Sequence, residues 1–291
     1  MSRQKPSLSP TAGLIVTYHS DTLRLQGILS RLATQCSVVI CDNSESPRQA
    51  HAISECVERI GVLYFWMGKN VGIARAQNIG IEYCWEHGAE RVLLLDDDSM
   101  PCEEIVHKLE AALDRTGSGR VVVGARAVCG GRDISNVRTK SDLTVCRDLM
   151  SSGSLICKSV FALVGPFDER LFIDGVDFDW GWRAQSLGVR LYLSSDATIE
   201  HRLGIGRLKL GMFGIRIPAS VRHYYQCRNV LILMRRRYTP WKWRLRQAFR
   251  VPIKLLFIAV ASPERRERIG YAISGICDAI RGHTGSIGNE R

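Results

Sequence analysis

The stretch LLLDDDSMP at residues 93–101 constrains the fold more than any other part of the sequence. A strand-like apolar run ends there in three carboxylates, Asp96–Asp98. In α/β proteins, polar side chains at the carboxyl ends of buried strands gather at one edge of the sheet. Two aspartates in an Asp-x-Asp step can hold a divalent cation, which allows a diphosphate to approach. The alternative is a solvated acidic turn, which Ser99 and Pro101 would also suit.

Strand-like and helix-like runs alternate around this stretch. We expect strands at residues 13–18, 37–45, 62–67, 91–99 and 120–128, and helices at about 21–33, 47–59 and 102–115. Residues 70–88 are expected to be a loop running into a helix that Gly88 ends. Residues 132–148 are polar and are expected to be irregular, and a strand and turn should lead into a helix over 149–161. The alternation predicts βαβ units and a mostly parallel sheet.

The charge of the chain is unevenly distributed. The net charge is +11, but residues 202–291 hold 19 Lys and Arg against four Asp and Glu, whereas the first 201 residues hold 21 basic and 25 acidic side chains. A basic tail seeks the phosphates of nucleic acid, anionic lipid or a lipid-linked sugar. We expect an N-terminal tail at 1–12, a catalytic domain at 13–204 and a basic, mostly helical extension at 205–291.

The ten cysteines and the N-terminus bear on the compartment. The cysteines form no CxxC pair, and residues 1–12 lack the apolar core of a signal peptide. We therefore expect reduced thiols in a cytoplasmic protein.

Aromatic and basic residues alternate in the first part of the extension. This cluster comprises Trp241, Trp243, Phe249, Arg235, Arg236, Arg237, Lys242, Arg244 and Arg246. The apolar run 251–261 that follows is far shorter than the ~20 residues needed to span a bilayer. It predicts a helix lying on an anionic membrane surface, with a helix packed on the protein's own core as the alternative. Nucleic-acid binders share this composition, but that interpretation leaves the acids at the strand ends unexplained.

Seven motifs, in a fixed order over about residues 13–204, make the chain resemble a known family. They are GLIVTY, CDNSE, NVGIARAQNIGI, LLLDDDS, SSGSLI, FDERLFIDGVDFDWGWRAQSLG and EHRLG. The chain resembles family 2 glycosyltransferases of the GT-A fold, whose Rossmann-like, mostly parallel sheet is flanked by helices. More narrowly it resembles the bacterial rhamnosyltransferases, whose usual donor is dTDP-L-rhamnose. The runs YYQCRNVLIL and IRGHTGSIG in the extension are also similar to this subfamily.

The resemblance implies a nucleotide-sugar site at the strand ends. Thr17 and Tyr18 would line the base pocket, and Asp42 would recognise the base or ribose. The alternatives are that Thr17 and Tyr18 only pack within the protein, and that Asp42 is an ordinary turn residue after a strand. The full implied set for the nucleotide sugar is Thr17, Tyr18, Asp42, Asn70, Gly72, Arg75, Asp96 and Asp97.

The resemblance also implies a metal site. Asp98 would coordinate Mg²⁺ or Mn²⁺ bridging the diphosphate, and Asp96 would hold ribose or a metal-bound water. Asp97 occupies the variable middle position. His201 ends the stretch LYLSSDATIEH, where this fold often places a further ligand, although a lone histidine is as often structural.

The motif VDFDWGWR is expected to supply the general base. Val176 stands where related enzymes often carry the first acid of a pair, and Asp177 stands at the second. Asp177 would be the base, with Asp174 as the second candidate. Asp177 also suits the N-cap of a helix running to Gly188.

The implied reaction is inverting transfer of rhamnose to a saccharide or lipid-linked acceptor in surface polysaccharide or glycolipid synthesis, on the inner face of the cytoplasmic membrane. Gly153 and Trp180 would contact the acceptor. No nucleic-acid partner is expected, and a homo-oligomer is left open. A UDP-sugar donor, as in galactofuranosyl transfer, is the alternative. Nucleotidyl transfer would need a basic Gly-rich loop that GLIVTYHSD does not offer.

Overall fold

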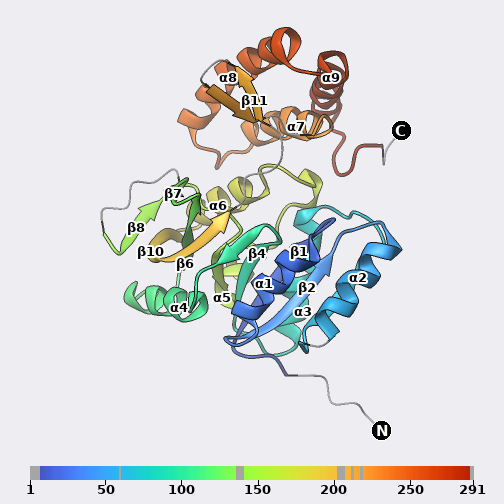
Figure 1. Ribbon diagram of the computed structural model, residues 1–291. Coiled ribbons are helices and arrows are strands. Elements are labelled where there is room, and N and C mark those ends of the chain that lie inside the picture. Colours follow the sequence, from blue (N-terminus) through green and yellow to red (C-terminus); the bar gives the residue numbers. More distant parts are fainter. Residues whose placement is uncertain are drawn as a thin grey trace.

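The computed structural model describes residues 7–58, 60–135, 141–201, 207–210, 213–216 and 219–288. Half of the expected N-terminal tail, the boundary expected between residues 204 and 205, and the middle of the expected loop 132–148 lie outside the described residues. Figure 1 shows an α/β body and, beside it, a group of three helices from the C-terminal part of the chain.

A single large sheet crosses the body in the order β3-β2-β1-β4-β9-β6-β10-β5. The strands β3, β2, β1 and β4 are parallel, whereas β9 runs antiparallel between β4 and β6. The long strand β10 is parallel to β6 and antiparallel to β5 and β8. The strands are β1 (Thr11–Thr17), β2 (Ser37–Asp42), β3 (Leu63–Trp66), β4 (Arg91–Asp96), β5 (Ser99–Pro101), β6 (Val121–Cys129), β7 (Arg132–Asp133), β8 (Leu143–Cys146), β9 (Ser154–Cys157) and β10 (Arg190–His201).

Helices cover both faces of the sheet because successive side chains of a strand point to opposite sides. In β4, Val92 and Leu94 belong to one core cluster and Leu93 and Leu95 to the other. The first cluster packs against α3 (Ile73–Glu86), α5 (Lys158–Val164) and α6 (Val176–Ser186). The second packs against α1 (Thr22–Leu32), α2 (Pro47–Glu58) and α4 (Ile105–Arg115).

Two local expectations are wrong. The stretch 132–148 is not simply irregular, because it contains β7 and β8, and β8 pairs with Leu191–Ser194 of β10. The N-cap of α6 is Gly175, not Asp177, since a left-handed residue at φ 90° turns the chain into the helix two positions earlier. Asp177 lies inside the first turn, where its Oδ1 accepts from the Phe178 N–H at 2.9 Å.

The C-terminal part begins with a hairpin of β11 (Arg207–Leu210) and β12 (Phe213–Arg216) and continues as α7 (Arg222–Met234), α8 (Trp241–Ala261) and α9 (Arg265–Arg281). A 3₁₀ turn, Glu169–Leu171, precedes α6 in the body. Among the described residues, no helix has both the length and the apolarity needed to cross a bilayer.

The helices α7 and α9 approach each other closely at Gly275. A Cβ atom built on Gly275 would lie 2.2 Å from the carbonyl oxygen of Tyr224, whereas one built on Gly270, in the same helix, would meet nothing within 4 Å. The contact therefore depends on the absence of a side chain at one position of α9.

We expect Gly275→Ala to lower the free energy of unfolding by about 1–3 kcal/mol, because the added methyl overpacks the α7–α9 contact. Gly270→Ala is the matched control and should be neutral or stabilising by up to ~1 kcal/mol, because alanine favours a helix over glycine. Urea unfolding followed by circular dichroism measures both. Equal stability of the two variants would contradict the close contact.

Candidate active site

A cleft of about 500 Å³ lies at the carboxyl ends of β1 and β4. The strand order reverses between these two strands, since β2 and β3 extend the sheet on the other side of β1. Such a switch point is where α/β sheets bind ligands. The polar residues lining the cleft are Tyr18, Asn43, Asn70, Gln77, Asp96, Asp97, Asp98, Ser151, Asp174, Asp177, His201 and Arg222.

The end of β4 and the end of β10 bring an acid and a histidine together. Asp98 Oδ1 lies 3.1 Å from His201 Nδ1, and Ser99, which pairs with His201 across β5 and β10, donates to or accepts from the same ring nitrogen at 2.9 Å. The hydrogen bond with Asp98 raises the pKa of His201 above its ordinary value. These residues are 102 or more positions apart in the sequence, and the antiparallel β5–β10 pairing places them side by side.

The other two aspartates of the run differ from each other. Asp97 accepts hydrogen bonds from the Tyr18 N–H at 3.0 Å and from the Ser20 hydroxyl, so it fixes the loop after β1. Asp96 has a buried Oδ1 without a hydrogen-bond partner among the described residues. Burial and the charges of Asp98 and Asp97 raise the pKa of Asp96 to about 7. A bound cation would give Asp96 Oδ1 a partner and would offset the repulsion among the three carboxylates.

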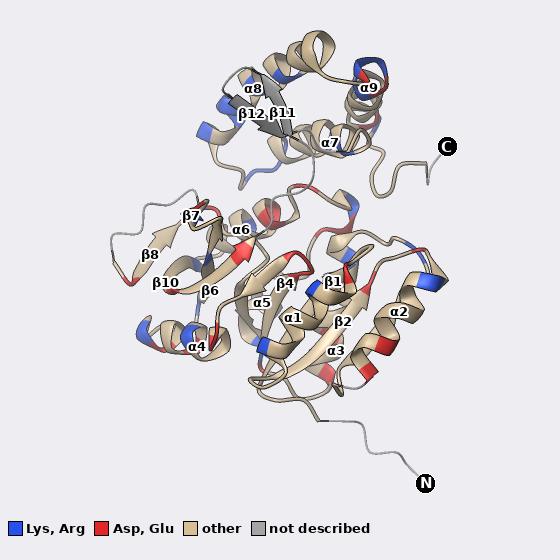
Figure 2. Ribbon diagram, in the orientation of Figure 1, with Lys and Arg blue, Asp and Glu red and all other residues tan. Residues whose placement is uncertain are grey.

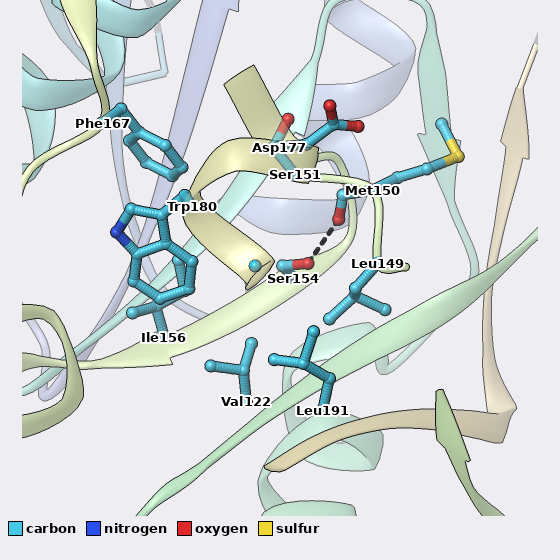
Figure 3. A pocket seen from close by; sticks show the side chains of 11 residues that line it. Val122, Leu149, Met150, Ser151, Ser154, Ile156, Phe167, Asp177, Trp180 and Leu191 are labelled. Carbon is cyan, nitrogen blue, oxygen red and sulfur yellow. Dashed lines mark hydrogen bonds between the residues drawn. The ribbon is translucent and has the colours of Figure 1, made fainter. Parts of the chain in front are cut away.

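Asp177 lies where the cleft meets a small apolar chamber. Figure 3 shows Asp177 and Ser151 at one end of this chamber, with Phe167 and Trp180 among its walls. The chamber has a volume of about 20 Å³. Burial is the main reason why the pKa of Asp177 rises to about 6, and the carboxylate of Asp174 adds to it. A carboxylate with this pKa can take a proton near neutral pH.

The loop before α6 has an unusual backbone. Phe172 (φ 64°), Asp174 (φ 65°) and Gly175 (φ 90°) all lie in the left-handed region, which side chains rarely adopt. Asn229 of α7 holds the loop in place, because its buried Nδ2 lies 2.7–2.8 Å from the carbonyl oxygens of Leu171, Ile173 and Asp174.

Two arginines of α7 complete this arrangement. Arg228 is fully buried and donates to the carbonyls of Arg170 and Leu171 at 3.1 and 3.0 Å. Arg222 donates to both carboxylate oxygens of Asp174, with Nη2–Oδ1 at 2.5 Å and Nε–Oδ2 at 3.2 Å. Asp174 is therefore occupied by an ion pair, whereas no described residue bonds to the second oxygen of Asp177.

The structure brings nine of the expected site residues to this cleft: Tyr18, Asn70, Gly72, Asp96, Asp97, Asp98, Asp174, Asp177 and His201. Gly72 is required there by its geometry, since at φ 84° a Cβ would lie 2.6 Å from the Phe172 ring. Asn70 Oδ1 accepts from the Gly72 N–H at 3.0 Å and so shapes the turn into α3.

Thr17 and Asp42 do not reach the surface of the cleft. Both are 0% exposed, and the Asp42 carboxylate accepts from Thr17 Oγ1 at 3.0 Å, from the Ser44 hydroxyl at 2.7 Å and from Tyr64 Oη at 2.7 Å. Through these protein partners, Asp42 connects β1, β2 and β3.

Three further residues lie apart from the cleft lining. Arg75 points to solvent and lies 4.0 Å from Glu169. Gly153 is buried, and its Cβ would lie 3.1 Å from that of Ala125. Trp180 is buried and donates from Nε1 to the Gly165 carbonyl at 2.8 Å, so it packs in the core of the body.

Sequence reasoning did not single out Arg222, Gln77 or Ser152. Arg222 lies just before the run YYQCRNVLIL, but only the fold shows that it faces Asp174. Gln77, within NVGIARAQN, is buried in the cleft wall with its Oε1 unpartnered among the described residues. Ser152 Oγ accepts from the Asp96 N–H at 3.0 Å and fixes the end of β4.

Residues 14–158 match the family model Glycosyl transferase family 2. The chain is also 31% identical over 291 residues to the dTDP-rhamnosyl transferase RfbF of Shigella flexneri, over 94% of this chain and 96% of that protein. This chain belongs to glycosyl transferase family 2. It is a glycosyltransferase, as the sequence motifs predicted.

Solved structures agree on the fold. S. aureus TarS 1–349 in complex with UDP-GlcNAc superimposes with a TM-score of 0.57 at 14% identity, covering 94% of this chain and 82% of that one. GalNAc-T7 with UDP, GalNAc and Mn²⁺ gives a TM-score of 0.60 at 12% identity, covering 92% of this chain and 55% of that one. This chain spans 40% of the longer S. aureus TarS chain. The fold is GT-A, as expected.

Proposed function

We propose that the protein transfers L-rhamnose from dTDP-L-rhamnose to a hydroxyl of an acceptor saccharide, with inversion at the anomeric carbon. The observation that carries the proposal is the meeting, in one cleft, of the Asp96–Asp98 and His201 cluster with Asp177. The identity of 31% to a dTDP-rhamnosyl transferase supports rhamnose as the transferred sugar.

The residues at the end of β4 and β10 fit a divalent cation. Within the described part of the chain, no three His, Cys, Asp or Glu side chains make a complete metal site. Mg²⁺ is commonly held by one or two carboxylates together with substrate phosphates, however, so a complete cage is not required. Asp98 and His201 would hold Mg²⁺ or Mn²⁺, with Asp96 nearby. The ion would neutralise the charge of the departing nucleoside diphosphate.

Asp177 is the proposed general base. Its free oxygen would accept the proton of the acceptor hydroxyl, whose oxygen then forms the bond to the anomeric carbon as the bond to the diphosphate breaks on the opposite face. Arg222 forms an ion pair with Asp174 and holds it in place, so Asp174 orients the segment while Asp177 takes the proton. Most of the side chains that line the chamber beside Asp177 are apolar.

The direct test is a donor screen that follows release of dTDP or UDP from purified protein with saccharide and lipid-linked acceptors. Release that requires dTDP-L-rhamnose and acceptor supports the proposal. If release occurs with a UDP-sugar such as UDP-galactofuranose and not with dTDP-L-rhamnose, the donor is the alternative one. The glycosyltransferase assignment would be unchanged.

We further propose that α8 places the enzyme on an anionic membrane surface. Six apolar side chains on one side of the helix are 53–68% exposed, and we call them the apolar stripe: Trp241, Leu245, Phe249, Ile253, Leu256 and Val260. Their spacing of three or four residues puts them on one face. Basic side chains flank the stripe, as in interfacial helices. The opposite side, with Trp243, Gln247 and Ile258, is buried against the protein.

Removal of the metal ligand Asp98 should abolish transfer. Removing a group that only supports a metal ligand lowers metal affinity by roughly 10–100-fold, and we expect Asp98→Asn to lose more than this. EDTA should inactivate the unaltered enzyme until Mg²⁺ or Mn²⁺ is added. The exposed Asp196, on the strand of His201, supplies the control Asp196→Asn, which should stay active. Full activity in EDTA would rule out the metal role.

Asp177→Asn should reduce kcat by roughly 10²–10⁴-fold, as expected for loss of a general base, while donor binding stays intact. Because the base works in its ionised form and its pKa is raised to about 6, the rate of the unaltered enzyme should fall as the pH drops through that value. A pH–rate profile and donor titration measure this. If Asp174→Asn is inactive and Asp177→Asn active, Asp174 is the base.

Phe249→Ser combined with Ile253→Ser should weaken binding to phosphatidylglycerol vesicles by about tenfold or more, because each buried apolar side chain contributes about 1.5–3 kcal/mol. Leu23→Ser combined with Ile60→Ser removes exposed apolar side chains from the body and should bind like the unaltered protein. Vesicle sedimentation measures both, and equal binding by the two variants would show that α8 does not face the membrane.

A further inference from the structure

A second cleft of about 560 Å³ opens between the α/β body and the C-terminal helices. The start of α6, α7 and α8 form its walls, and its volume falls in the range of ligand pockets. Asp174, Gly175 and Phe178 line this cleft and the first one alike. A molecule entering through the second cleft would therefore meet the donor beside Asp177.

The charges along this cleft are unbalanced. Its two acids are already occupied, because Asp148 accepts from Trp182 Nε1 at 2.9 Å and Asp174 is paired with Arg222. Arg246 and Arg250 also line the cleft, and within the described residues neither has an acidic partner or a hydrogen bond. Two unpaired guanidinium groups one helical turn apart suit a phosphate, which arginine binds in a bidentate manner.

The position of these arginines on α8 is informative. At about 100° per residue, Arg246 and Arg250 project between the apolar stripe and the buried side that carries Trp243 and Gln247. Basic residues recur at Lys242, Arg246, Arg250 and Lys254, and Figure 2 shows basic residues on α8. The row thus runs from the exposed side of the helix toward its buried side, where Lys254 bonds to Gln226.

We propose that Arg246 and Arg250 bind the phosphate of a membrane-anchored acceptor, a saccharide joined to a lipid through a phosphate or diphosphate, and that the second cleft holds its saccharide. This inference rests on the proposed function and names the residues that bind the acceptor at the same site. The lipid would stay with the apolar stripe, the phosphate would lie at Arg246 and Arg250, and the saccharide would extend toward Asp177. An ordinary lipid headgroup would use the two arginines but not the second cleft.

The test uses full-length protein without donor, and phosphatidylcholine vesicles carrying either geranylgeranyl diphosphate or an equal charge of phosphatidylglycerol. Arg246→Gln combined with Arg250→Gln should bind the diphosphate vesicles about tenfold or more weakly, because each removed arginine loses a charge-assisted hydrogen bond. The control is Arg265→Gln combined with Arg266→Gln, which removes the same charge from exposed positions of α9.

The outcomes separate the sources of the phosphate. A loss on diphosphate vesicles that exceeds the loss on phosphatidylglycerol vesicles, and that the α9 control does not share, supports the proposal. Arg246→Lys combined with Arg250→Lys should keep phosphatidylglycerol binding but not the full affinity for the diphosphate. Equal losses in both double variants, or on both vesicle types, overturn it and assign the arginines to ordinary headgroups. Because no donor is present, failure of the rhamnose assignment would not affect this result.

Discussion

The cleft depends on one buried polar interaction, the contact of Arg228 and Asn229 with the loop that carries Asp174. Both side chains are almost fully buried, and they donate to the backbone carbonyls of Leu171, Ile173 and Asp174 and of neighbouring residues. Arg228 also lies 5.2 Å from the ring centroids of Tyr224 and Tyr225, so carbonyl dipoles and aromatic faces compensate its charge. An unpaired buried charge would cost several kcal/mol, so this network holds the loop and α7 together as one unit.

This network changes how the C-terminal region is understood. Its sequence suggests a basic appendage, but α7 supplies the side chains that hold a left-handed loop against the carboxyl end of the sheet. Two arginines of the predicted basic cluster also bond within the protein, since Arg235 donates to the Ala279 carbonyl at 2.6 Å and Arg236 bonds to Asp168. The tail is thus divided: one side of α8 packs on the protein and the other exposes the apolar stripe.

Sequence patterns identified the features that depend on local chemistry. The strand ending in Asp96–Asp98 and the alternation of strands and helices over the first 115 residues are visible because apolar runs and acidic turns are contiguous in the chain. Features that depend on distant pairing were not visible. β8 is a strand only because β10 offers it an edge, and Arg222 faces Asp174 from 48 positions away. The contacts of Asp42 with Thr17 and Tyr64 were not visible either, because a carboxylate at a strand end looks the same in the sequence whatever it contacts.

The hydrogen bonds made by Gly285 have a consequence for biosynthesis. Arg228 Nη1 donates to the Gly285 carbonyl at 2.6 Å, and the Gly285 N–H donates to the Arg170 carbonyl at 2.7 Å. Domains fold from the N-terminus as the chain is synthesised, so the sheet and its acidic cluster form while residues near Gly285 are still inside the ribosome. The loop beside Asp174 gains its last hydrogen bonds only after the residues near Gly285 have emerged. A nascent chain is therefore able to form the acidic cluster at the end of β4 well before the wall that Asp174 belongs to is complete.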